Sequence, residues 1–177
     1  MSCVRLQLTD NPILDENLTL LGQIQDILST VSESDYLTEH RELGIAPIGK
    51  HVRHILDFYE CLLRDLDARE INYDNRERVV QVERSRTFAL GTTDRIRSQL
   101  SHIDKQLIVK VASLISENGS TVVTSSTLMR ELAFLAGHTT HHLAIVAIII
   151  RLNGKSPDPA LGVSVSTRAN LERLRNH

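Results

Sequence analysis

The stretch SSTLMRELAFLAGHTTHHLAIVAIIIRLN, residues 125–153, decides the fold of this chain. Its apolar residues recur at helical spacing and Gly154 follows directly, which predicts one long helix that ends at about residue 153. His138 and His142 lie four positions apart, so on a helix they project from one face, one turn apart. Glu131 shares that face to within about 40°, whereas His141 lies about 100° from His142.

This histidine pair points to a metal. Two imidazoles on the apolar face of a helix would cost about 1–3 kcal/mol for each group left without a hydrogen-bond partner. A metal ion removes that cost, because it takes a lone pair from each neutral ring. A purely structural or incidental pair is the alternative, and a third ligand from elsewhere would favour the metal.

A second helix offers that third ligand. Pro47 opens it, its apolar stripe ends near Ala68, and it contains His51 and His54. If this helix packs antiparallel to residues 125–153, His54 lies about 11 Å and His142 about 15 Å from the helix ends that meet. Three histidines with an open position are typical of a catalytic zinc site.

Two other residues share these faces but lie too far along the helix axis to be ligands. Cys61 is about 10 Å from His54, and Glu131 is equally far from His138. We expect Cys61 to be a small core residue. For Glu131 we expect a buried ion pair with Arg76 or Arg78.

The other segments complete a single domain over residues 1–177. A first helix is expected from Pro12 to about Ser32, a polar connection at 33–46, a charged irregular segment at 72–78 and a third helix over 84–101. β-branched residues at 106–112 and 121–124 flank an Asn-Gly turn, which predicts a hairpin before the last long helix. A short amphipathic helix is expected at 168–175. The predicted class is all-α, a four-helix bundle with a small β-hairpin.

Composition bears on partners and location. The net charge is −2, with three Tyr, three Phe and no Trp, which argues against nucleic-acid binding. The longest apolar run, residues 143–150, is far shorter than the roughly 20 residues of a membrane span. Residues 1–8 lack the apolar core of a signal peptide. Because Cys3 and Cys61 show no CxxC spacing, we expect reduced thiols and a soluble, cytoplasmic protein.

Two motifs resemble those of a known family. PIGKHVRHILD (47–57) is similar to the second-helix motif His-(Leu/Ile)-x-Asp of the DinB-like (DinB/YfiT) superfamily, and LAGHTTHH (135–142) to its fourth-helix motif His-x-x-x-His. The resemblance covers nearly the whole chain. It implies up-down-down-up helix order, a divalent metal held by His54, His138 and His142, and a homodimer.

The resemblance also implies a class of reaction. Family members with assigned activities are similar to metal-dependent thiol-S-transferases, in which the metal lowers the pKa of a thiol that attacks an electrophile. The expected partner is therefore a small-molecule thiol or electrophile, and hydrolase-like activation of water is the other option. Zinc is the first choice of metal, and nickel, iron and manganese also suit imidazole ligands. The candidates for a catalytic role, or for a contact that supports the ligands, are His51, His141, Asp57 and Glu131.

The chain departs from the family pattern at two places. Many members have Trp near the start of the second helix and Arg-Gly-Gln after the last motif histidine. Here those positions are Ala46-Pro47 and Leu143-Ala144-Ile145. The alternative hypothesis is therefore a non-catalytic dimeric bundle that keeps the fold for partner binding, with residues 143–150 in the core or in a dimer interface.

Overall fold

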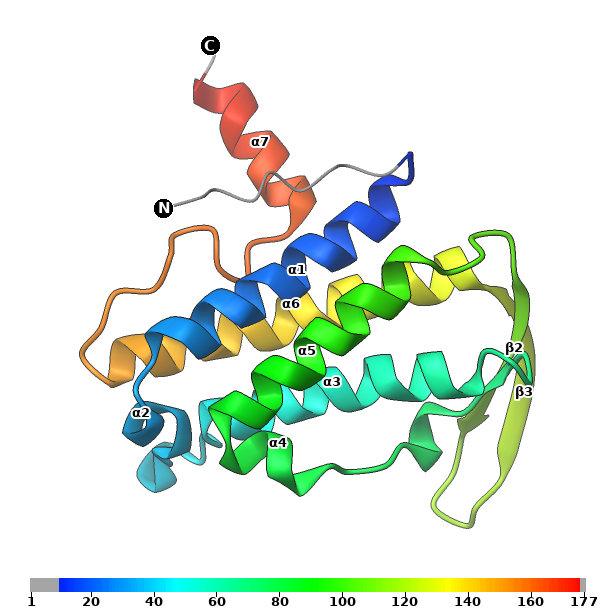
Figure 1. Ribbon diagram of the computed structural model, residues 1–177, viewed down its shortest axis with the longest axis horizontal. Coiled ribbons are helices and arrows are strands. Elements are labelled where there is room, and N and C mark those ends of the chain that lie inside the picture. Colours follow the sequence, from blue (N-terminus) through cyan, green and yellow to red (C-terminus); the bar gives the residue numbers. More distant parts are fainter. Residues whose placement is uncertain (1–9, 176–177) are drawn as a thin grey trace.

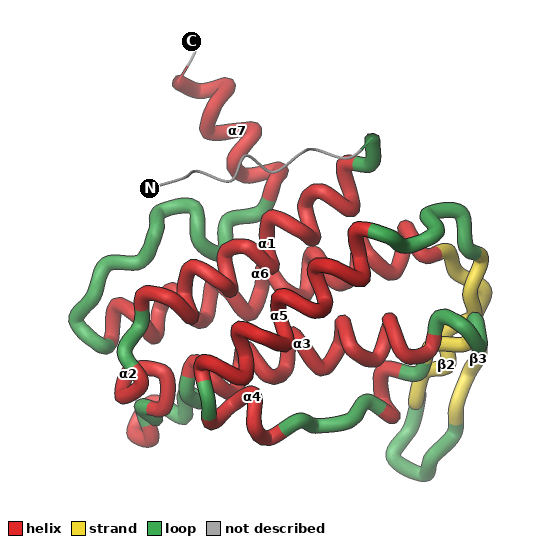
Figure 2. Tube along the Cα trace, in the orientation of Figure 1, coloured by secondary structure: helices red, strands yellow, loops and turns green. Residues whose placement is uncertain are grey.

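Four long helices form the body of the computed structural model, which describes residues 10–175. They are α1 (Pro12–Thr30), α3 (Ile48–Asp65), α5 (Arg86–Ser101) and α6 (Leu128–Leu152). α1 and α3 each contact both α5 and α6, so the four helices enclose a common apolar core (Figures 1 and 2). All four were predicted, with bounds that differ by a few residues. The up-down-down-up order stays a prediction.

Capping residues set the starts of these helices. The Asn11 side chain accepts hydrogen bonds from the amides of Ile13 and Leu14, and Pro12 occupies the first turn of α1. Ser85 accepts from the amide of Phe88 at the start of α5. Because Ser85 has an extended backbone, it also ends the preceding helix α4 (Val80–Arg84).

The connections contain more structure than the sequence predicted. The polar connection 33–46 holds α2 (Glu33–Leu37), capped by Ser32, and the 3-10 helix η1 (Arg41–Leu43). A second 3-10 helix, η2 (Tyr73–Asn75), lies in the charged segment 72–78. The last helix, α7 (Val165–Arg175), covers the predicted terminal helix and has no buried residues.

A small sheet closes one end of the helical body (Figure 1). The predicted hairpin is present as β2 (Ile108–Leu114) and β3 (Thr121–Thr127), which pair antiparallel. A third strand, β1 (Glu70–Ile71), pairs parallel with β2 and was not predicted. β1 closely follows α3, and β3 leads directly into α6. The sheet therefore ties together the two helices on which the predicted ligands lie.

α6 is long and apolar enough to cross a membrane by length and composition alone. Its position is that of a core helix, because it contacts α1 and α3 and buries ten residues between them. Cys61 is a buried free thiol, and burial raises its pKa to about 12. Cys3 and the other residues of the segment 1–9 lie outside the described part of the chain.

Candidate metal centre

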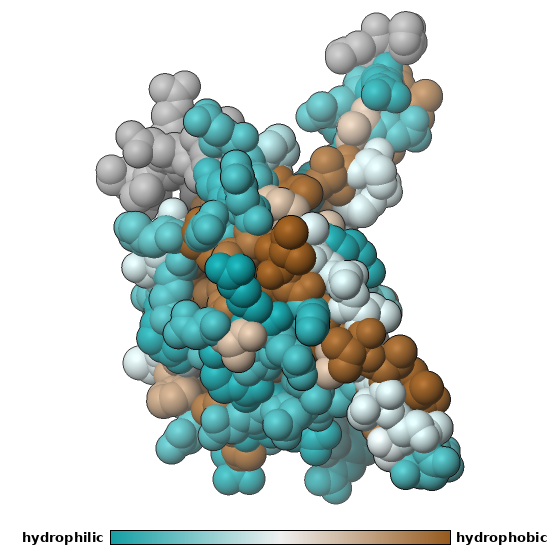
Figure 3. Space-filling view, turned by 90° about the vertical axis from the view of Figure 1, so that its right-hand side faces the viewer, coloured by the Kyte–Doolittle hydropathy of each residue, from teal (hydrophilic) through white to brown (hydrophobic). Residues whose placement is uncertain are grey.

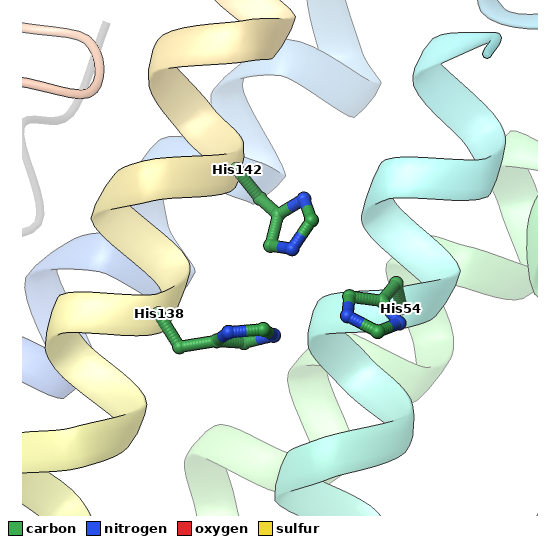
Figure 4. A group of neighbouring side chains, drawn as sticks. All are labelled: His54, His138 and His142. Carbon is green, nitrogen blue, oxygen red and sulfur yellow. The ribbon is translucent and has the colours of Figure 1, made fainter.

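Three histidines converge between α3 and α6 (Figure 4). His54 projects from α3, and His138 and His142 project from successive turns of α6. Each ring offers one nitrogen, and these three atoms lie within 4.8 Å of one another. The ring of His142 lies 4.6 Å, centroid to centroid, from those of His54 and His138. The structure thus brings together the three residues that the sequence singled out as ligands.

Burial keeps these rings neutral. It is the largest cause that lowers the pKa of His54 to about 4 and that of His142 to about 3, and the neighbouring ring of His138 lowers both further. Burial also lowers the pKa of His138. All three rings are therefore uncharged at neutral pH, which is the form that binds a metal.

One ring nitrogen of the three proposed ligands is both buried and without a hydrogen-bond partner among the described residues. Nε2 of His138 is buried and makes no hydrogen bond within residues 10–175. A buried polar atom without a partner costs about 1–3 kcal/mol, so native structures rarely leave one. A metal ion held by the three imidazoles would bind this lone pair. The residues present therefore fit the divalent metal that the resemblance implies.

His51 contacts the cluster from one turn earlier on α3. Its Nδ1 lies 3.0 Å from Nδ1 of His142, so one of the two nitrogens must donate a proton to the other. This contact leaves Nε2 of His142 as the atom available to a metal, and Figure 4 shows one ring nitrogen of His142 turned toward His54 and His138. Metal-binding histidines usually donate their second N–H to a fixed acceptor. His51 occupies that acceptor's place in the tautomer whose Nδ1 accepts; its own Nε2, which is buried, then carries the proton and makes no hydrogen bond within residues 10–175.

The other candidates lie outside the cluster. His141 is exposed, and its ring centroid is 5.2 Å from that of His142. The Asp57 carboxylate is buried and accepts from Arg53 at 2.8 Å and from the amide of Val79 at 3.3 Å. Burial raises the pKa of Asp57, and these two partners oppose the rise. Asp57 therefore joins α3 to the segment before α4.

Glu131 has a different partner from the one expected. Its carboxylate accepts a hydrogen bond from Ser126 at 2.5 Å and lies 4.0 Å from a nitrogen of Arg130. Arg76 instead donates to the carbonyl of Tyr73 at 2.8 Å. Glu131 thus holds the start of α6 to β3 and makes no described ion pair with the segment 72–78.

Sequence reasoning missed the aromatic wall of the site. Phe58 lies one turn after His54, and its ring centroid is 4.3 Å from that of His138. Phe134 lies one turn before His138, with its centroid 5.9 Å away. Arg76 places its guanidinium carbon 4.6 Å from the centroid of Phe58. The four-residue spacing of both phenylalanines from the ligands was the signal that could have found them.

A buried polar network lies behind the cluster and joins three helices. The Tyr59 hydroxyl on α3 donates to Asn17 on α1 at 2.7 Å and accepts from Thr139 on α6 at 3.3 Å. The Asn17 amide donates to the carbonyls of Ile13 and Leu132. Thr139 directly follows His138, so this network fixes α6 against α3 at the level of the ligands.

Comparison with known proteins agrees with this geometry. The family model described as the DinB superfamily matches residues 20–146, which include all three histidines. A comparison with curated proteins gives no match. The matched region covers more than half of the chain, from within α1 through most of α6.

Proposed function

This chain belongs to the DinB superfamily, and on that premise we propose that it binds a divalent metal ion through His54, His138 and His142. The convergence of the three imidazoles, with Nε2 of His138 buried and unpartnered, is the observation that supports this most. Zinc is the metal we propose first, since three imidazoles suit it, with nickel, iron or manganese as alternatives. The proposal includes the up-down-down-up bundle, supported by the directions of the long helices in Figure 1.

The proposed activity is a transfer or hydrolysis reaction of the thiol-S-transferase or hydrolase type. A metal bound by three neutral ligands would supply Lewis-acid chemistry that lowers the pKa of a thiol or a water molecule. The chain's own residues then have separate roles. Nδ1 of His51 accepts a hydrogen bond from the Nδ1–H of His142 and so orients that ring. Phe58 and Phe134 cover His138 and keep water from it on that side.

A homodimer in the cytoplasm, with no nucleic-acid or membrane partner, is part of the same proposal. Apolar side chains exposed near the hairpin support the dimer. Ile108, Ile115 and Val123 are each more than half exposed, and Figure 3 shows hydrophobic patches among a hydrophilic surface at this end of the molecule. Burying such side chains against a second copy would remove them from water.

Metal analysis of the purified protein tests the first part. We expect about one equivalent of metal in the wild type and a large loss in His142→Ala. His141→Ala is the matched control, because that residue is the exposed neighbour on the same helix, and it should keep its metal. Equal, near-zero metal content in the wild type and His142→Ala would refute the proposal.

The non-catalytic alternative keeps one specific observation in its favour. Leu143, Ala144 and Ile145 replace the polar residues that many family members have after the last ligand, and Leu143 is fully buried. A screen of thiol–electrophile pairs with metal-loaded protein separates the two hypotheses. Metal-dependent consumption of thiol that His142→Ala abolishes supports the enzyme. A stable dimer that binds metal but turns over no pair supports the binding role.

A further inference from the structure

The last helix, α7, stands away from the body of the protein (Figures 1 and 3). Each of its 11 residues is at least partly exposed, and Leu171 and Leu174 are 46% and 66% exposed. A helix shorter than about 12 residues is marginal in water unless an apolar face packs against something else. Within one copy of the described chain, α7 lacks that packing.

Arg168 ties the first turn of α7 to the body. Its Nη2 donates to both carboxylate oxygens of Glu16 on α1, at 2.9 and 3.1 Å, and its Nη1 donates to the Val163 carbonyl at 2.6 Å. Residues 169–175 form no hydrogen bond or ion pair with other elements of the described chain. The helix is therefore held at its base, and its outer half is open to other contacts.

The outer half of α7 combines an apolar face with positive charge. Leu171 and Leu174 are three positions apart, so they share one face of the helix. Arg173 and Arg175 lie beside them, are exposed and form no ion pair within residues 10–175. Such a surface suits a partner that offers an apolar floor and a negative rim.

A cavity with an apolar floor lies on the same side of the molecule. It has a volume of about 540 Å³ and is formed by the second half of α1, the end of α6 and the segment 155–161, which leads to α7. Figure 1 shows this segment and α7 on the same side of α1. The buried apolar side chains that line the cavity are Ile27, Val31, Ile150 and Leu161.

Two carboxylates give this cavity a negative rim. Asp26 and Asp158 line it and are exposed, and neither forms an ion pair within residues 10–175. Lys155 also lines the cavity, but its charge is paired with that of Asp35. The cavity therefore complements the outer half of α7 both in its apolar floor and in its charge.

The wall that the segment 155–161 contributes is fixed at both ends. The amide of Lys155 donates to the Ile150 carbonyl at 3.0 Å, and Leu161 is buried. Gly162 then lies so close to α6 that a Cβ on it would be 2.2 Å from the backbone nitrogen of Ala144. Because these contacts form the cavity in advance, a partner that binds there need not order the segment first.

We propose that α7 of one copy of this chain binds in the cavity of a second copy, which returns the same contact. Since α7 and the cavity lie on one side of each copy, a two-fold axis can place each helix at the other's cavity. The inference rests on the proposed homodimer and names its contact surface. α7 and the segment 155–161 lie outside residues 20–146, which the family model matches, so they are additions to that domain.

Matched charge reversals test the exchange by sedimentation velocity. The first variant reverses the helix, Arg173→Asp with Arg175→Asp, and the second reverses the cavity, Asp26→Arg with Asp158→Arg. The wild type should be a dimer, and each variant should dimerise about a hundredfold more weakly, because like charges would then face each other. An equimolar mixture of the two variants should dimerise again, since reversed helix meets reversed cavity and wild-type helix meets wild-type cavity.

A second route and a control keep the test specific. Leu171→Ser with Leu174→Ser, which leaves the charges alone, should also weaken the dimer. Glu77→Arg with Arg84→Asp is the matched control, because these are exposed charges beside α4, on the opposite side from α7. It should leave the dimer intact, and circular dichroism should show each variant folded.

The outcomes separate this contact from the proposed function. A wild-type dimer that both helix variants leave intact, or a mixture that stays monomeric, overturns the role of α7 alone. Loss of the dimer in Ile115→Asp, with no loss in either helix variant, does the same and assigns the contact to the hairpin. A monomeric wild type overturns the proposed homodimer together with the role of α7. Metal content measured on the same samples reports separately on the histidine site.

Discussion

Replacing Tyr59 with phenylalanine removes the hydroxyl at the centre of the network behind the histidines. Tyr59 and Asn17 are fully buried and Thr139 is 1% exposed, so water cannot substitute for the lost group. The Asn17 carbonyl oxygen loses its donor and the Thr139 hydroxyl loses its acceptor. A buried group left unsatisfied costs about 1–3 kcal/mol. For a chain of this size that corresponds to a fall in Tm of about 2–4 °C per kcal/mol.

Urea unfolding of metal-free protein, followed by circular dichroism, measures this loss as a change in midpoint at constant slope. Thr139→Val and the variant with both substitutions complete a double-mutant cycle. We expect an interaction energy of about 0.5–3 kcal/mol between positions 59 and 139. Thr140→Val is the control, because within residues 10–175 that hydroxyl donates to the Ala136 carbonyl on its own helix and to no other helix. A loss under about 0.5 kcal/mol for Tyr59→Phe, or strict additivity with Thr139→Val, would refute the role of the network.

Three further predictions concern pH, packing at two glycines and the contact between His51 and His142. Metal-free protein should lose stability as the pH falls below 6.5. In the unfolded chain histidines take up protons near that ordinary pKa, whereas in the folded protein the pKa of His54 is lowered to about 4 and that of His142 to about 3. Urea midpoints that stay constant from pH 7.5 to 4.5 would contradict this. Gly49→Ala should lower the free energy of unfolding by about 1–3 kcal/mol, since the new Cβ would lie 2.2 Å from the Glu83 carbonyl oxygen. Gly91→Ala in α5 has open space around it and should stabilise the protein slightly in the same urea assay. His51→Ala should weaken metal binding about 10–100-fold in a chelator competition, and an unchanged affinity would show that His142 needs no partner.

Much of the site followed from helix geometry alone. The spacing of His138 and His142 fixed their common face, and counting residues from the helix ends placed His54 at a matching depth. The structure puts their nitrogens within 4.8 Å of one another. These inferences succeeded because a regular helix has one rise and one twist per residue, so positions on it can be calculated.

The remaining features depend on contacts that no periodicity encodes. β1 has only two residues, too few for an alternating pattern, and its parallel pairing with β2 joins segments far apart in the chain. The approach of His51 to His142 depends on side-chain rotamers. The partner of Glu131 was predicted from the wrong segment, because Ser126 and Arg130 come close only once β3 continues directly into α6.

The order of these elements along the chain affects when the histidine site can form during synthesis. α4, α5, β2 and β3 all lie between His54 and His138 in the chain. During synthesis, His54 leaves the ribosome well before its two partners, because it precedes them in the chain. The nascent chain therefore presents only one of the three proposed ligands until α6 has docked. Tight metal binding would then be acquired only by chains that have nearly completed folding, which would make metal content a measure of correctly assembled protein in the cell.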